Sequence, residues 1–156
     1  TGSPIFADGV YVPTDVLDVH PGSSTDTIVA WTAPTSGDYT ISGSFALLDI
    51  TPHPIIGEVY EGSSQLYSQV LTGPGATSDA VGGSESFDLT EYVSAGETIY
   101  FGVNDDNDYD FQSTGLIATI ESVGVPEPAT WVLMLAGFAG MGAMLRARRE
   151  KVNALA

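Results

Sequence analysis

Residues 27–49, TIVAWTAPTSGDYTISGSFALLD, decide the fold of this chain. The stretch holds two runs in which apolar and polar residues alternate, joined by Pro34-Thr35-Ser36-Gly37-Asp38, which has the composition of a turn. Because successive side chains of a strand point to opposite sides, each run predicts a strand with one buried face. The residues expected on those faces are Val29, Trp31 and Ala33 before the turn, and Tyr39, Ile41, Gly43, Phe45 and Leu47 after it.

The same pattern continues as far as residue 122. Runs of strand character at 55–60 and 65–71 flank a turn at 61–64, runs at 86–93 and 98–103 flank a turn at 94–97, and a last run covers 114–122. GPGATSDAVGGS, at 73–84, is a glycine-rich loop, and no window before residue 126 shows a helical period. Seven to nine short strands at this spacing predict an all-β fold, an antiparallel β-sandwich of the jelly-roll type.

A different kind of segment follows at the C-terminus. Residues 129–145 carry no charge, and as a helix they would span about 25 Å, close to the ~30 Å hydrocarbon core of a bilayer. A helix buried in a globular core would need a polar face, and this run has none. It therefore predicts a single transmembrane-type helix. Every Lys and Arg of the chain lies in the tail 146–156, which places that tail in the cytoplasm and the preceding domain on the far side.

The order of features in this segment resembles a known sorting signal. Pro-Glu-Pro, then the apolar span, then the arginines look like the PEP-CTERM signal of Gram-negative bacteria, read by an exosortase, a membrane-embedded cysteine transpeptidase-like enzyme. The resemblance implies export, transient anchoring in the inner membrane, and removal of the tail near Pro-Glu-Pro on the way to the cell surface or extracellular matrix. The signal residues would be Pro126, Glu127, Pro128, Arg146, Arg148 and Arg149.

Four segments are expected along the chain. They are an exported β-sandwich domain at 1–122, a linker with the Pro-Glu-Pro motif at 123–128, the hydrophobic span at 129–145 and a basic cytoplasmic tail at 146–156. An exported protein needs a leader, and the chain begins TGSPIF without one. We therefore expect the numbering to start after a removed signal peptide or inside a longer reading frame. Because there is no cysteine, no disulfide supports the domain.

The charge of the exported part is one-sided. Of the 20 acidic residues only Glu127 and Glu150 lie beyond residue 125, so residues 1–125 hold the other 18 and no Lys or Arg. Nucleic acid is excluded as a partner of this part, because phosphate contacts require cations. Solubility at a crowded surface is one interpretation of the excess, and screening by divalent cations is another.

The acidic residues concentrate in one loop, NDDNDYDFQS, at 104–113. If the stretch were extended, Asp106, Asp108 and Asp110 would point the same way and could ligate calcium, which takes six to eight oxygen ligands. The EF-hand pattern fails, because Phe111 and Ile117 stand where that loop has Gly and Glu. A solvated acidic loop is the alternative. No other cofactor is expected.

Aromatic and histidine residues provide the remaining candidates. Trp31 and Tyr39 are expected in the core, although an exposed Trp31 would make a platform for sugar stacking. Some of Tyr60, Tyr67, Tyr92, Tyr100 and Tyr109 must be partly exposed, and tyrosines on a sheet face suit a polysaccharide but are also ordinary strand residues. His20 and His53 lie in proline-bounded loops without the spacing of a zinc site, and we expect structural or solvent-facing roles for both.

Catalytic motifs are missing from the sequence: there is no GxSxG, P-loop, GxGxxG or cysteine, so an enzyme is not expected.

A second resemblance concerns the domain itself. The segments LDVHPG, VAWTAPTSGDYTISGSF, SAGETIYFGV and STGLIATI resemble parts of many exported PEP-CTERM β-sandwich proteins, which in turn resemble carbohydrate-binding jelly rolls.

Two functions follow from these features. One is a structural protein of the bacterial surface or biofilm matrix, and the other is a carbohydrate-binding module for exopolysaccharide, assisted by calcium. Exposed aromatics on one sheet face would favour sugar binding, and buried aromatics with an exposed strand edge would favour self-association. The sequence does not identify ligand-binding residues.

Overall fold

The computed structural model describes residues 2–124, 138, 141 and 144. By its contacts the chain divides into two units, Thr1–Val123 and Gly124–Ala156, and the strands that the structure describes all lie in the first. The strands are β1 (Ile5–Ala7), β2 (Val10–Val12), β3 (Leu17–Val19), β4 (Thr27–Thr32), β5 (Gly37–Leu47), β6 (Ile55–Glu61), β7 (Ser64–Leu71), β8 (Ser84–Val93), β9 (Thr98–Asn104) and β10 (Thr114–Ser122).

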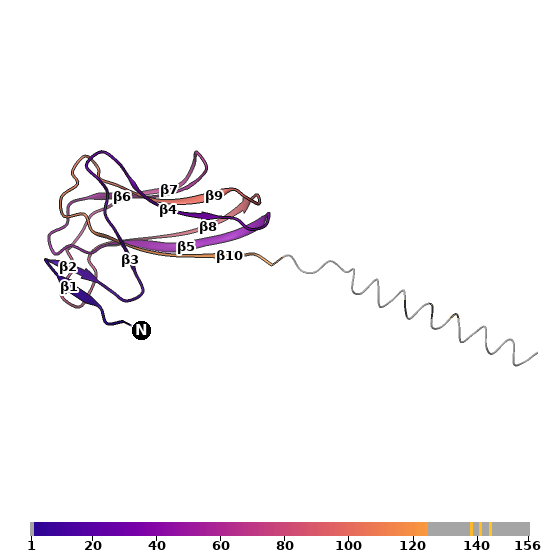
Figure 1. Ribbon diagram of the computed structural model, residues 1–156, viewed down its shortest axis with the longest axis horizontal. Coiled ribbons are helices and arrows are strands. Elements are labelled where there is room, and N and C mark those ends of the chain that lie inside the picture. Colours follow the sequence, from indigo (N-terminus) through magenta and orange to yellow (C-terminus); the bar gives the residue numbers. More distant parts are fainter. Residues whose placement is uncertain (1, 125–137, 139–140, 142–143, 145–156) are drawn as a thin grey trace, which may run out of the picture. The chain divides into compact units, whose positions relative to one another are not determined.

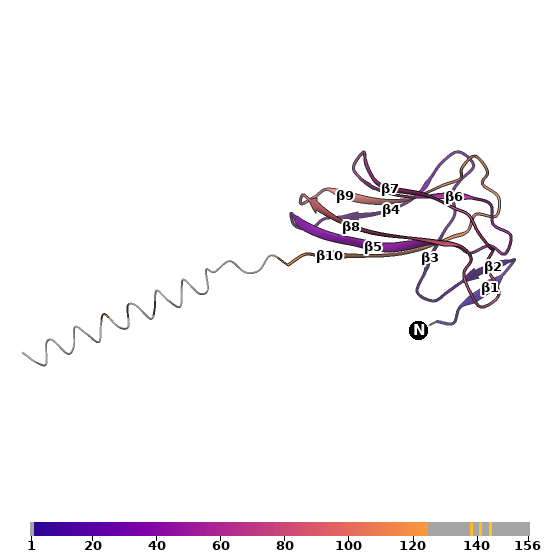
Figure 2. The same cartoon turned by 180° about the vertical axis from the view of Figure 1, so that it is seen from behind.

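Eight of these strands form a jelly roll. One sheet has the order β3-β10-β5-β8 and the other β4-β9-β6-β7, and all pairings within them are antiparallel. The two sheets lie face to face as two layers (Figures 1 and 2). Except at the β6–β7 connection, consecutive strands of the sandwich belong to opposite sheets, as in a double Greek key. The predicted all-β sandwich of jelly-roll type is therefore confirmed.

The turn-linked runs of the sequence behave differently from simple hairpins. Only β6 and β7 pair with each other across their turn, whereas the turns after β4 and after β8 carry the chain from one sheet to the other. The apolar faces of the two runs in 27–49 thus meet across the layers. Trp31 and Tyr39 show this directly, because their rings pack edge to face with centroids 5.1 Å apart.

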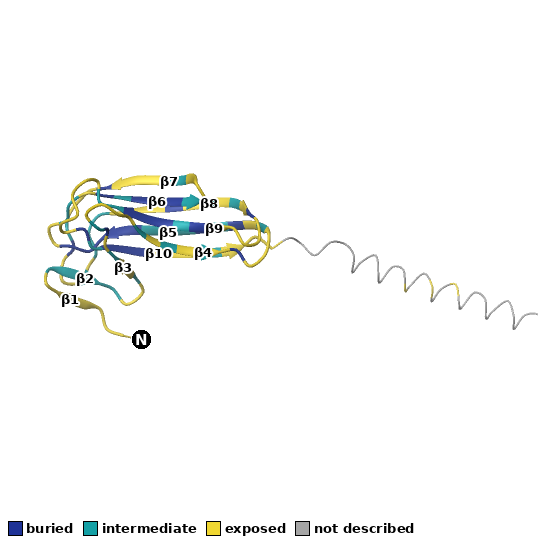
Figure 3. Cartoon of the chain, turned by 45° about the horizontal axis from the view of Figure 1, so that its top comes forward, coloured by how far each residue is buried: buried dark blue, intermediate teal, exposed yellow. Residues whose placement is uncertain are grey.

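Phe45 lies at the centre of the core between the sheets. Its side chain is fully buried, and its ring lies 5.6 Å from that of Phe87 and 6.5 Å from that of Tyr67. Gly57, on the facing strand β6, makes room for it, since a Cβ at that position would lie 2.6 Å from Phe45 Cδ2. Dark-blue buried positions occur along strands of both sheets in Figure 3.

The buried faces predicted for residues 27–49 agree with this core. Ala33, Tyr39, Ile41, Phe45 and Leu47 are buried, and Val29 and Trp31 are partly buried against them. Gly43 permits a close approach, because a Cβ there would collide with the Ile117 carbonyl oxygen and with Phe87. Among the residues that the structure describes, all members of the core cluster lie between Val19 and Ile120.

The two ends of the sandwich differ in their connections. The loops 20–26, 48–54, 72–83 and 105–113 gather at one end, and the short turns 33–36, 62–63 and 94–97 lie at the other. Strand β10 begins at the loop end, where Thr114 pairs with Leu47, and finishes at the turn end, where Ser122 pairs with Tyr39. The chain therefore leaves the domain at the turn end.

Three N-terminal strands were not predicted. Strands β1, β2 and β3 have three residues each, too few to show an alternating pattern. Asp8 and Gly9 connect β1 to β2 with φ values of 51° and 83°, the left-handed pair that an Asp-Gly hairpin turn requires.

The predicted C-terminal elements lie mostly outside the described residues. These are the linker 123–128 beyond Gly124, the span 129–145 except Phe138, Met141 and Met144, the tail 146–156, and with them every signal residue. Within residues 2–124, 138, 141 and 144, no helix is long and apolar enough to cross a bilayer.

Candidate functional site

The outer face of the β4-β9-β6-β7 sheet presents two neighbouring tyrosines. Tyr60 on β6 and Tyr100 on β9 are directly opposite each other in the ladder and are both partly exposed. They face away from the core, because their neighbours Val59, Ile99 and Phe101 are the buried residues of these strands. Opposed residues have Cβ atoms about 5 Å apart, so both tyrosines project from neighbouring positions on the same face of the sheet.

Polar side chains surround Tyr60. Gln65 on β7 donates from Nε2 to the Tyr60 hydroxyl at 2.8 Å and to Glu58 Oε1 at 2.9 Å, and Ser68 Oγ donates to the same carboxylate oxygen at 3.4 Å. Partial burial, a hydrogen bond to Glu58 and the charge of that carboxylate raise the pKa of the Tyr60 phenol. Tyr60, Glu58 and Gln65 thus form one hydrogen-bonded group on the outer face.

Gly102 is the next outward-facing residue of β9 after Tyr100, and it is buried among its neighbours. It lies between Ile28 on β4 and Glu58 on β6 in the next row of the ladder. A Cβ at this position would meet nothing closer than Glu58 Cβ at 3.9 Å, which is ordinary contact, and its φ is not in the left-handed region. The backbone conformation therefore does not require glycine here, and a side chain at 102 would add bulk to the outer face beside the tyrosines.

The outward-facing positions of β9 continue to the loop end. Tyr100, Gly102 and Asn104 alternate on the outer face over about 13 Å. Asn104 Nδ2 donates to Asp26 Oδ1 at 2.7 Å, which joins β9 to the loop 20–26. Beyond this bond lies a depression of about 510 Å³, whose lining residues are Ser23, Ser24, Asp26, Asn104, Asp105, Asn107 and Tyr109.

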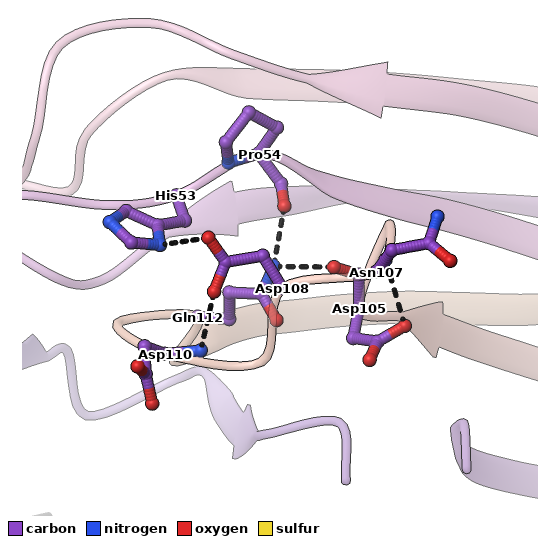
Figure 4. Close-up of polar contacts among 7 residues, drawn as sticks. All are labelled: His53, Pro54, Asp105, Asn107, Asp108, Asp110 and Gln112. Atoms are coloured by element: carbon purple, nitrogen blue, oxygen red, sulfur yellow. Dashed lines mark hydrogen bonds and ion pairs between the residues drawn. The ribbon is translucent and has the colours of Figure 1, made fainter. Parts of the chain in front are cut away.

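The acidic loop is folded rather than extended. Asp106, Asn107 and Phe111 have φ values of 44°, 68° and 54°, so the alternation of carboxylates expected for an extended stretch does not occur. Side-chain oxygens instead accept hydrogen bonds from backbone N–H groups two residues ahead: Asp105 Oδ1 from Asn107 at 3.1 Å and Asp108 Oδ1 from Asp110 at 3.4 Å (Figure 4). Short polar side chains stabilise tight turns in this way.

Two further contacts hold this loop on the sandwich. Gln112 is fully buried, and its Nε2 donates to the carbonyls of Pro54 at 2.6 Å and Asp105 at 2.8 Å. The Nδ1 atom of His53 lies 2.9 Å from Asp108 Oδ2 but off the line of a hydrogen bond, and its ring packs against Phe111 (Figure 4). His53 thus has a structural contact, and Asp108 belongs to the framework of the loop.

The calcium site at Asp106, Asp108 and Asp110 stays a prediction. Among the residues that the structure describes, no group of three His, Cys, Asp or Glu side chains is placed to hold a metal ion. Calcium ligation would require the loop to rearrange, because Asp108 already contacts His53 and the Asp110 backbone.

A thermal melt decides whether calcium binds. If it does, saturating calcium at a hundred times Kd adds about 2.7 kcal/mol and raises the melting temperature by about 10 °C, whereas matched magnesium has little effect. Replacing Asp106, Asp108 and Asp110 together by Asn should then remove the rise. Equal shifts with both ions, or a shift that survives the substitutions, would leave the loop as solvated acid.

The other candidates from the sequence lie in ordinary positions. Trp31 and Tyr39 pack in or against the core, and the Tyr39 hydroxyl donates to the Thr35 carbonyl at 2.8 Å. Tyr67 packs against the core, whereas Tyr92 is exposed on the other sheet. His20 Nδ1 lies 2.7 Å from the Pro21 carbonyl oxygen.

Sequence reasoning named both tyrosines but missed their neighbours. Glu58, Gln65, Gly102, Asn104 and Asp26 come from four segments of the chain, and only the ladder of β4, β9, β6 and β7 brings them together. The available signal was the period of two on β6 and β9, which already places Tyr60 and Tyr100 opposite to the buried side of each strand.

Comparison with known proteins identifies the end of the chain. Residues 124–149 match the family model described as the PEP-CTERM protein-sorting motif. No curated protein matches the chain. The chain therefore carries a sorting signal, which implies export, membrane-anchored sorting before cleavage, and recognition by exosortase-type processing machinery.

The solved structures that are similar to this chain have low sequence identity to it and low TM-scores. A family 35 carbohydrate binding module from an environmental isolate has 16% identity and a TM-score of 0.41, over 80% of this chain and 93% of that one. A pentameric capsid protein from metagenomic phage sequences has 19% identity and a TM-score of 0.32, over 78% of this chain and 67% of that one. At such scores the jelly-roll assignment rests on the strand order alone.

Proposed function

We propose that this chain is a non-catalytic, exported protein of the bacterial surface or extracellular matrix whose sandwich domain binds polysaccharide. The tyrosine face is the site: Tyr60, Tyr100, Gly102, Glu58 and Gln65 on the outer side of the β4-β9-β6-β7 sheet. The observation that carries the proposal is the placement of Tyr60 and Tyr100 side by side on this face. Adjacent, partly exposed aromatic rings offer apolar faces for sugar rings, and their rims offer hydroxyls for hydrogen bonds.

The hydrogen bonds around Tyr60 support this role. Gln65 holds the Tyr60 hydroxyl and Glu58 Oε1 at fixed positions before any ligand arrives, which reduces the entropy lost on binding. The Glu58 carboxylate and the Gln65 carbonyl oxygen can accept further hydrogen bonds from sugar hydroxyls, since each oxygen has two lone pairs. A strip of about 13 Å along β9 suits several sugar units of a polymer.

The path of the chain is compatible with a tethered binder. Strand β10 ends at the turn end of the sandwich, and the sorting motif begins at residue 124. The outward-facing row of β9 and the depression beside Asp26 lead toward the opposite, loop end of the sandwich. The candidate site therefore extends away from the end of the domain at which the chain continues to the sorting motif.

Alanine substitutions test the proposal. We expect Tyr60→Ala and Tyr100→Ala each to weaken binding to the host's exopolysaccharide about tenfold in affinity electrophoresis, because each removes one stacking surface. Tyr92→Ala is the matched control, since Tyr92 is 62% exposed but lies on β8 of the other sheet. Equal binding by all three variants and the wild type would refute the site.

Gly102→Val separates binding from stability. A valine fits the strand conformation, and its Cβ would be in ordinary contact with Glu58 at 3.9 Å, so the melting temperature should change little, yet it adds a branched side chain to the outer face beside the tyrosines. Gly37→Val is the control, because a Cβ at Gly37 meets nothing within 4 Å and Gly37 lies on β5 of the other sheet. Loss of binding only at 102, with both variants folded, supports the outer face around 102 as part of the site.

Self-association is the competing function. Strand β7 forms a sheet edge of eight residues, SQLYSQVL, without a charged side chain, and such edges can pair with another copy. The neighbouring edge strand of the facing sheet, β8, carries Glu85, Asp88 and Glu91, which oppose pairing. Sedimentation at physiological salt distinguishes the two functions: a monomer is expected, and oligomers abolished by a Lys substitution in β7 would favour assembly.

A further inference from the structure

We infer that the polysaccharide bound by the tyrosine face is uncharged, and that glycans bearing carboxylate, sulfate or phosphate groups are rejected. The inference rests on the proposed function and specifies the chemical class of its ligand. It follows from the carboxylates around this face and from the lack of Lys and Arg in residues 1–125.

Carboxylates follow the outward-facing row of β9. Glu58 flanks Gly102 directly across the ladder, and Asp26 is held by Asn104 at the top of β9. Asp105 lines the adjoining depression, and further carboxylates follow it at 106, 108 and 110. A ligand that passes from Tyr100 toward Tyr109 therefore passes Glu58, Asp26 and Asp105 in turn.

No cation is available to receive an acidic sugar. Residues 1–125 contain no Lys or Arg, and the two histidines make other contacts: His20 with the Pro21 carbonyl and His53 with Asp108. Recognition of carboxylate, sulfate or phosphate groups depends on Arg, Lys or clustered backbone N–H groups. An acidic glycan on this face would have to leave water without gaining a partner, close to several like charges.

Hydroxyl groups are the complementary ligands for this surface. A carboxylate or an amide oxygen accepts hydrogen bonds from O–H groups, and hydrogen bonds to charged acceptors are the stronger kind. Glu58 and Gln65 supply such acceptors beside the Tyr60 ring. A polymer of neutral sugars satisfies them all and brings no charge of its own.

Backbone-matched polymers test the inference. The processed protein is run in affinity gels that contain hydroxyethylcellulose, dextran or galactomannan, and in gels with the carboxymethylated form of the same backbone. A chelator is present throughout, so that divalent cations cannot bridge protein and polymer. Diethylaminoethyl-dextran forms the cationic arm. Each gel is run at low and at about 0.5 M salt, where screening shortens the range of charge effects to about 4 Å.

We expect at least one neutral polymer to retard the wild type, and its carboxymethylated form to bind at least about tenfold more weakly at low salt. The difference should shrink as salt rises. The cationic polymer should bind the wild type and the Tyr60→Ala/Tyr100→Ala double variant equally well, and high salt should release both. Its binding depends only on the net negative charge of the domain.

The experiment distinguishes a failure of this inference from a failure of the proposed function. Tyrosine-dependent binding of a carboxymethylated polymer as strong as that of its neutral parent, or tyrosine-dependent binding of the cationic polymer alone, overturns the inference and leaves the site in place. Retardation by no polymer, or equal retardation of wild type and the double tyrosine variant by neutral polymers, overturns the proposed function itself.

Discussion

Phe45→Ala should lower the melting temperature of the sandwich domain by about 10 to 25 °C. Removing a fully buried phenylalanine costs about 3–5 kcal/mol, a large part of the 5–15 kcal/mol that holds a typical domain folded. The cavity cannot close easily, because Phe45 is in contact with Phe87 and Tyr67 and with Gly57, which has no side chain to move inward.

Phe6→Ala is the matched control for this prediction. Phe6 lies in the N-terminal hairpin and is 48% exposed, so its truncation should change the stability by less than about 1 kcal/mol. Trp31, half-buried at the edge of the core, reports unfolding by fluorescence. Similar losses for the two substitutions would mean that the core is not centred on Phe45.

Replacing Pro126-Glu127-Pro128 by three alanines should abolish processing altogether. The motif lies within the sorting signal at 124–149, and an exosortase-type enzyme that no longer recognises it leaves the tail attached. In the native host, intact-mass measurement of released wild-type protein should show a C-terminus near the motif. The variant should remain with the membrane fraction at full length.

The same triple replacement at 77–79, in an exposed loop, should leave processing unchanged. One result contradicts the sorting assignment: recovery of wild-type protein from outside the cells with Arg146 to Ala156 still attached. The prediction is independent of any ligand, since it concerns only residues beyond the sandwich.

Much of the fold follows from local sequence patterns. The alternation in 27–49 correctly predicted which side chains meet in the core, because burial of one face dictates a period of two. The partners of each strand were not predictable, since the turns after β4 and β8 look like hairpin turns but change sheets. The Asp8-Gly9 turn had a recognisable signal, yet its flanking strands have only three residues each.

The candidate site, too, was predictable in part from local sequence patterns. A period of two places Tyr60 and Tyr100 on the outer side of their strands, but the strands are adjacent only because β9 lies between β4 and β6 in the sheet. The role of Gly102 depends on what a Cβ would meet there, which no pattern in the sequence reveals. The acidic loop misled the prediction, because left-handed residues at 106, 107 and 111 fold it where extended backbone was assumed.

The most direct test of the central claim is the location of bound sugar on the sandwich. Amide chemical shifts of the processed, isotope-labelled protein are followed during titration with a neutral oligosaccharide from the host polymer. Binding at the tyrosine face predicts shifts at Tyr60, Tyr100 and Gly102, and none at Thr90 and Tyr92 on β8. Shifts confined to β8 or to the loop 105–113, with β6 and β9 unchanged, would contradict it.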